Sequence, residues 1–143
     1  MIAVDTNILV YAHRGDSAYH QPAQETIRDF AEGRRSWAIS WPSIHEFLAV
    51  VTHPRIYDPP TPADMAVAQV EAWLDSPSLV VIAEGNDHWD QLKPMMTTGA
   101  TGPRVHDARI AALCNGAGVT ELWSADRDFT RFPIRTRNPL IAG

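Results

Sequence analysis

Four short apolar runs, separated by longer segments with helical periodicity, restrict the fold of this chain more than any other feature. Each run is three or four residues long, the length of a short buried strand. Strands that alternate with helices favour a parallel sheet covered by helices on both faces. The sequence therefore predicts an α/β fold with strands over residues 2–4, 37–40, 79–82 and 121–124.

The segments between these runs carry apolar residues at helical spacing. Residues 54–62 contain four prolines, so they cannot continue a helix and must form an irregular connection. With 143 residues, 45% of them hydrophobic, the chain has enough apolar material for one core, and we expect a single domain over 1–143. The expected helices cover residues 17–32, 42–52, 65–74, 86–96 and 103–115.

The single cysteine, Cys114, excludes an internal disulfide and lies in an apolar helical pattern, so we expect a buried thiol in a reducing compartment. No basic leader with an apolar core precedes Asp5, and no apolar run approaches the roughly 20 residues that cross a bilayer. These features predict a soluble, cytoplasmic protein without membrane contact.

The charges are distributed unevenly. A net charge of -5 argues against a protein that coats nucleic acid, because such affinity comes mainly from neutralising phosphates. Residues 104–143, however, hold six Arg and only four acidic side chains. A guanidinium suits phosphate recognition, although a genome that favours Arg codons explains the same bias equally well.

Acidic side chains follow two of the predicted strands. Asp5 comes directly after the first run, and Asp126 and Asp128 come after the fourth. Functional groups in an open parallel sheet gather beyond the carboxyl ends of the strands. We therefore expect these acids to lie in one region of the molecule.

Two further acids, Glu46 and Asp107, lie near the starts of predicted helices on faces that are otherwise apolar. Carboxylates that converge at the edge of a core repel one another and lose hydration, so some are protonated or a cation neutralises them. Oxygen ligands select Mg²⁺ or Mn²⁺ over zinc. The apolar neighbours are Ala49 and Val50 for Glu46, and Ile110, Ala111 and Cys114 for Asp107.

Each acid also has a structural explanation. Asp5 is a good cap for a helix that begins near Asn7. Glu46 stands three residues after Ser43, as in a capping box, and the helix dipole favours Asp107 in a first turn. Asp126 and Asp128 fit an ordinary polar turn. Their joint placement, rather than any single acid, favours a metal site.

Four pieces of the sequence carry a family resemblance: IAVDTNILVYA, SIHEFL, HDARIAAL and LWSADRDF. In this order they resemble the PIN domain, and specifically the VapC-type toxins of bacterial toxin-antitoxin pairs. The resemblance implies a three-layer α/β/α sandwich with a central, mainly parallel sheet. It also implies a Mg²⁺-dependent endoribonuclease that forms a homodimer and binds a VapB-like antitoxin.

The resemblance assigns roles by position. Asp5, Glu46, Asp107 and Asp126 match the acidic quartet. In our hypothesis the three aspartates hold one ion or two of Mg²⁺ or Mn²⁺, and Glu46 orients or deprotonates the attacking water. The supporting positions are Asn7 and Ser124, with Asp128 ranked below Asp126 because Asp126 is closer to the strand end. Candidates for contacts with RNA phosphates are Arg104, Arg109, Arg127 and Arg131, although Arg109 is equally suited to pairing with an acid.

Other classes of protein remain as alternatives. A haloacid dehalogenase phosphatase places a second Asp two residues after the first, where this chain has Asn7. A non-catalytic RNA-binding or protein-binding module would leave the four acids unexplained. A structure-specific DNA nuclease of related fold is the nearest chemical rival, and cleavage of RNA and DNA side by side separates the two.

Overall fold

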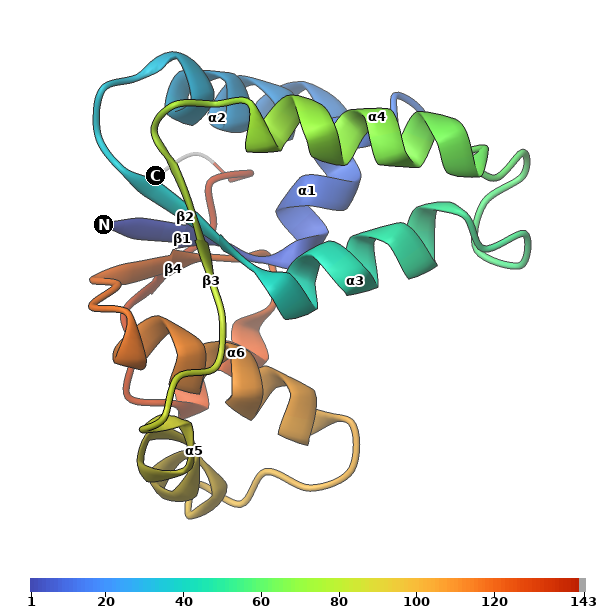
Figure 1. Cartoon of the computed structure of the whole chain (residues 1–143). Coiled ribbons are helices and arrows are strands. Elements are labelled where there is room, and N and C mark those ends of the chain that lie inside the picture. The colour runs from blue at the N-terminus through green and yellow to red at the C-terminus, as the bar shows by residue number, and fades with distance from the viewer. Residues whose placement is uncertain (142–143) are drawn as a thin grey trace.

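A computed structural model of the chain describes residues 1–141, and its centre is a five-stranded sheet (Figure 1). All paired strands run parallel, in the order β3-β2-β1-β4-β5. The α/β prediction with a parallel sheet is confirmed. The strands are β1 (Ile2–Val4), β2 (Trp37–Ser40), β3 (Leu79–Ile82), β4 (Glu121–Trp123) and β5 (Thr136–Arg137).

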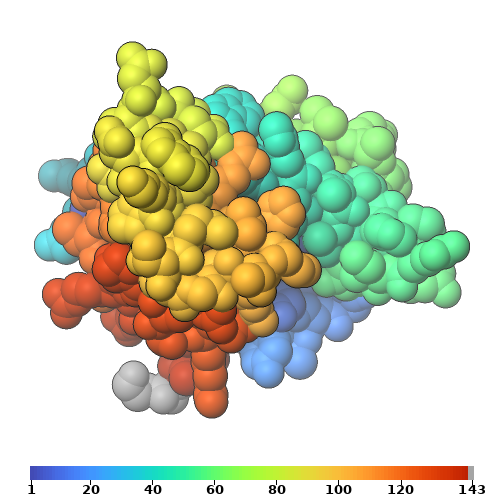
Figure 2. All heavy atoms as spheres, turned by 90° about the horizontal axis from the view of Figure 1, so that it is seen from below, coloured from blue at the N-terminus to red at the C-terminus, as the bar shows by residue number. Residues whose placement is uncertain are grey.

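Helices cover both faces of the sheet, which gives the three layers implied by the family resemblance. Figure 1 shows α1, α2 and α4 above the sheet and α5 and α6 below it, while α3 extends from the strand ends. From below, the yellow segment of α5 lies over part of the near face of the molecule, and the teal segment of α3 lies to its side (Figure 2). The helices are α1 (Thr6–His13), α2 (His20–Glu32), α3 (Trp41–Val51), α4 (Ala63–Leu74), α5 (His88–Met96) and α6 (Arg104–Gly116), and a 3₁₀ turn, η1 (Arg127–Arg131), follows β4.

The strands divide their side chains between two cores. Successive side chains of a strand point to opposite faces. Ala3 and Ala38 pack with residues of α5 and α6, whereas Val4, Trp37 and Ile39 pack with residues of α1 to α4. Both faces of the central strands β1 and β2 are buried, which explains why these two strands are almost wholly apolar instead of alternating with polar residues.

Two features at the end of the sheet differ from the prediction. Strand β4 ends at Trp123, so Ser124 lies just beyond the strand. Strand β5 was not predicted, because it has only two residues, Thr136 and Arg137, and neither belongs to an apolar run.

Cys114 is buried in α6, as expected, and this burial raises the pKa of its thiol to about 12. A thiol of such high pKa is a poor nucleophile, because the thiolate is the reactive form. Within residues 1–141, no helix combines the length and the apolar character that a bilayer crossing demands.

Candidate active site

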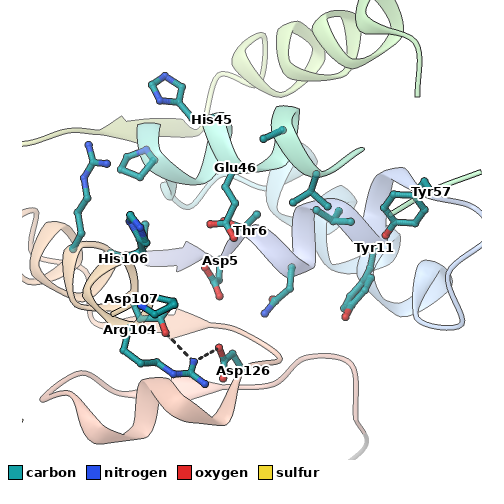
Figure 3. A pocket seen from close by; sticks show the side chains of 18 residues that line it. Asp5, Thr6, Tyr11, His45, Glu46, Tyr57, Arg104, His106, Asp107 and Asp126 are labelled. Atoms are coloured by element: carbon teal, nitrogen blue, oxygen red, sulfur yellow. Dashed lines mark hydrogen bonds and ion pairs between the residues drawn. The ribbon is translucent and has the colours of Figure 1, made fainter. Parts of the chain in front are cut away.

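An open pocket of about 760 Å³ lies at the carboxyl ends of the strands. The four acids of the predicted quartet all line it, although they come from four different parts of the chain (Figure 3). The parallel sheet explains this convergence, because β1 and β4 are neighbours and end at the same edge. The quartet consists of Asp5 after β1, Glu46 in α3, Asp107 in α6 and Asp126 after β4.

Asp5 is the most deeply placed of these acids. Only 6% of the residue is exposed, and Ser124 Oγ donates a hydrogen bond of 2.8 Å to its Oδ2. Desolvation raises the pKa of Asp5 to about 7; the nearby charges of Glu46 and Asp107 add to the rise, and the bond from Ser124 opposes it. The residue occupies the N-cap position of α1, but its side chain makes no capping hydrogen bond. Helix capping therefore does not explain this carboxylate.

The Ser124 hydroxyl joins three parts of the site. Besides donating to Asp5, its oxygen accepts hydrogen bonds from Asn7 Nδ2 at 3.3 Å and from the backbone N–H of Asp126 at 3.0 Å. Asn7 in turn accepts from the backbone N–H of Ala125 at 3.2 Å. The structure thus places Asn7 and Ser124 where they hold the loop after β4 against the start of α1.

Glu46 lies in the second turn of α3, exposed at the pocket. The capping-box explanation is wrong, because the N-cap of α3 is Ser40, whose Oγ accepts from the backbone N–H of Ser43 at 3.2 Å. Glu46 is instead held by Thr6, whose hydroxyl donates to Oε2 at 3.2 Å. Ala49, predicted to form an apolar face with Glu46, is exposed and also lines the pocket, so the predicted apolar face around Glu46 is wrong.

Asp107 and Asp126 are bridged by Arg104. Its Nη1 donates to Asp107 Oδ2 at 3.0 Å and to Asp126 Oδ2 at 3.4 Å, and its Nη2 pairs with Asp128 (Figure 3 shows the first two contacts). Burial raises the pKa of Asp107, and the hydrogen bond from Arg104 opposes that rise. Asp126 also caps η1 by accepting from the backbone N–H of Asp128 at 2.8 Å, so the polar-turn explanation describes part of its role.

The pocket offers four carboxylates, which are the kind of ligand that a hard divalent cation takes, beside the imidazoles of His45 and His106. The buried carboxylate, that of Asp5, has a neutral hydroxyl as its side-chain partner. The side chains are not yet gathered around one point: within residues 1–141, no three His, Cys, Asp or Glu side chains are arranged to hold a metal ion. Arg104 provides positive charge among the acids in this arrangement.

The comparisons with known proteins agree with this architecture. Residues 2–134 match the family model described as PIN domain. The chain belongs to the PIN domain family. It is 32% identical to ribonuclease VapC48 and 33% identical to ribonuclease VapC43, both of Mycobacterium tuberculosis; the matches cover 94% and 98% of this chain and 94% and 96% of those proteins.

Solved structures show the same fold. The crystal structure of VapBC2 from Rickettsia felis, bound to a DNA fragment from their promoter, matches with a TM-score of 0.70 and 19% identity, over 96% of this chain and 98% of that one. The sarcin-ricin loop cleaving toxin VapC20 of Mycobacterium tuberculosis matches with a TM-score of 0.66 and 20% identity, over 91% and 93%.

Only two of the four arginines predicted to contact RNA line the pocket of this PIN domain, namely Arg104 and Arg109. Arg109 pairs with Glu84, outside the acidic quartet. Arg131 lies 3.9 Å from Asp128, and Arg127 is exposed.

Tyr11 and Tyr57 line one side of the pocket, and neither was predicted from the sequence. Tyr11 lies one helical turn after Asn7, so a helix assignment for residues 6–13 identifies it. Tyr57 belongs to the Pro-rich connection, where no periodicity indicates the direction of a side chain.

Proposed function

We propose that this chain is a Mg²⁺-dependent endoribonuclease and the toxin of a type II toxin-antitoxin pair. The observation that carries the proposal is the convergence of Asp5, Glu46, Asp107 and Asp126 on one pocket. The names of the relatives support RNA as the substrate, because VapC48 and VapC43 are ribonucleases and the matches span nearly the whole chain.

A phosphodiester resists hydrolysis because its negative charge repels the attacking nucleophile. A divalent cation supplies the opposing charge and lowers the pKa of a bound water. In this chain Asp5, Asp107 and Asp126 would hold the cation. They come from three separate segments, namely the residue after β1, helix α6 and the loop after β4.

Glu46 is the residue that we assign to the attacking water. Thr6 holds its Oε2, which leaves Oε1 to orient the water and accept its proton. Ser124 keeps the Asp5 carboxylate in one orientation, and Asn7 keeps the backbone of the β4 loop beside it. In-line displacement by the water leaves a 5′-phosphate and a 3′-hydroxyl.

A cleavage assay tests the proposed function. The purified chain is incubated with a structured RNA and with DNA of the same sequence, in Mg²⁺ or in EDTA. We expect RNA fragments with 5′-phosphates in Mg²⁺ and no fragments in EDTA. Cleavage of DNA alone would identify the chain as a DNA nuclease, and RNA binding without turnover would identify it as a binding module; either result contradicts the proposal.

The proposed partners are a cognate antitoxin and a second copy of this chain. The structural match to the VapBC2 assembly supports an antitoxin. Exposed apolar side chains on α4, among them Met65 at 58% and Val67 at 50%, would suit the homodimer. A cytoplasmic location stays a prediction from the sequence.

A further inference from the structure

Arg104 has an unusual position for a residue expected to bind RNA phosphates, because its guanidinium already contacts three carboxylates. We propose that Arg104 is an internal counter-cation, which neutralises the acids in the metal-free chain and must leave before a divalent cation binds. Metal binding and Arg104 then compete for the same oxygens. This inference rests on the proposed function, because it concerns the metal that the acids would hold.

The contacts of Arg104 join two elements of the site. Asp107 lies one turn along α6 from Arg104, whereas Asp126 and Asp128 lie beyond β4. A single nitrogen, Nη1, donates hydrogen bonds to Oδ2 of Asp107 and to Oδ2 of Asp126. These two aspartates are assigned to the metal in the proposed mechanism, so the metal would need oxygens that the guanidinium now contacts.

The balance of charge explains why a cation is needed there. Five carboxylates lie in this region, and a cluster of like charges is unfavourable without compensation. Among the ion pairs of residues 1–141, Arg104 is the only cation paired with Asp107 or Asp126. The five carboxylates are those of Asp5, Glu46, Asp107, Asp126 and Asp128.

Arg104 is also able to leave. Its side chain is 40% exposed, and ion pairs at such exposure contribute little to stability because water screens them. A guanidinium keeps its charge at every accessible pH, so Arg104 departs by rotating into solvent rather than by losing a proton. A displaced Arg104 would remain at the rim of the pocket, close to an incoming phosphate.

Calorimetric titration of Mn²⁺ at pH 8 into Arg104→Gln and Arg109→Gln tests the competition. Arg109 is the matched control, since it lines the same pocket and is 42% exposed but pairs with Glu84. We expect Arg104→Gln to bind Mn²⁺ about tenfold more tightly than the natural chain and Arg109→Gln to stay within about twofold. Arg104→Lys keeps the charge but loses the planar fork, so its affinity for Mn²⁺ should lie between those of Arg104→Gln and the natural chain.

Affinity of Arg104→Gln equal to or weaker than that of the natural chain overturns the inference, because weaker binding would mean that Arg104 arranges the acids for the metal. That result leaves the proposed function intact, provided that the natural chain binds Mn²⁺. Failure of every variant to bind Mn²⁺ overturns both. Thermal unfolding gives a second readout: Mn²⁺ should raise the Tm of Arg104→Gln more than that of the natural chain, and an equal rise speaks against competition.

Discussion

Asp5→Asn is expected to lower the rate of RNA cleavage at matched Mg²⁺ by about 10³-fold. Asn keeps the shape of the side chain and an oxygen that accepts the hydrogen bond from Ser124, but it removes the negative charge that the metal needs. Single-turnover cleavage measures the loss. Asp29→Asn is the matched control, because Asp29 is exposed on α2 and is not among the residues that line the pocket, and this variant should cleave at the natural rate.

The same substitution should stabilise the metal-free chain. Burial raises the pKa of Asp5 from 3.8 to about 7, so the folded state binds this proton more tightly than the unfolded state does. The free energy of unfolding therefore falls as the pH rises from about 4 to 7. Asn carries no charge and avoids this loss. We therefore expect the free energy of unfolding of Asp5→Asn to exceed that of the natural chain by about 2 to 4 kcal/mol at pH 8 and by less at pH 5.

Urea unfolding in EDTA measures this stability. Loss of cleavage together with increased stability separates a functional role of Asp5 from misfolding. Full cleavage by Asp5→Asn would refute the assigned role, and reduced stability at pH 8 would contradict the burial of an uncompensated charge.

Ser124→Ala is expected to shift the pH dependence of metal binding. The bond from Ser124 lowers the pKa of Asp5 against the effect of burial, so its removal moves this pKa above 7. Metal binding requires the ionised carboxylate; below its pKa, the affinity of the natural chain should rise up to about tenfold per pH unit. In Ser124→Ala the rise should occur at higher pH, and cleavage at pH 7 should fall about 10-fold to 100-fold.

Mn²⁺ titrations from pH 6 to 9 follow this shift. Raising the pH should restore much of the affinity of Ser124→Ala, because the carboxylate is still present. An unchanged pH profile would show that the Ser124 hydroxyl does not control Asp5. A uniform loss of affinity at every pH would indicate that the hydroxyl acts on the shape of the β4 loop alone.

Strand topology was sufficient to predict that two of the acids would meet. The apolar runs and helical spacing predicted four strands, and the rule that strand ends meet at one edge predicted that Asp5 and Asp126 would lie near each other. Apolar neighbours placed Asp107 toward the core, where Ile110 and Cys114 are indeed buried. These predictions succeed because they depend on periodicity and topology rather than on side-chain detail.

The features that the sequence did not predict depend on which of several nearby groups forms a contact. Ser43 and Glu46 have the spacing of a capping box, but Ser40 at the end of β2 takes the N-cap and moves the helix start. The bridge from Arg104 to Asp126 spans 22 residues and depends on the rotamers of both side chains. No rule of residue spacing predicts that Arg109 pairs with Glu84.

In this scheme, folding brings the acids together so that they bind a divalent cation. The most direct test is a crystal structure of the chain with Mn²⁺, located by its anomalous scattering. We expect an ion within coordination distance of Asp5 and of Asp107 or Asp126, with the Arg104 guanidinium turned out of the pocket. A pocket without an ion at saturating Mn²⁺, or an ion bound away from Asp5, would contradict it.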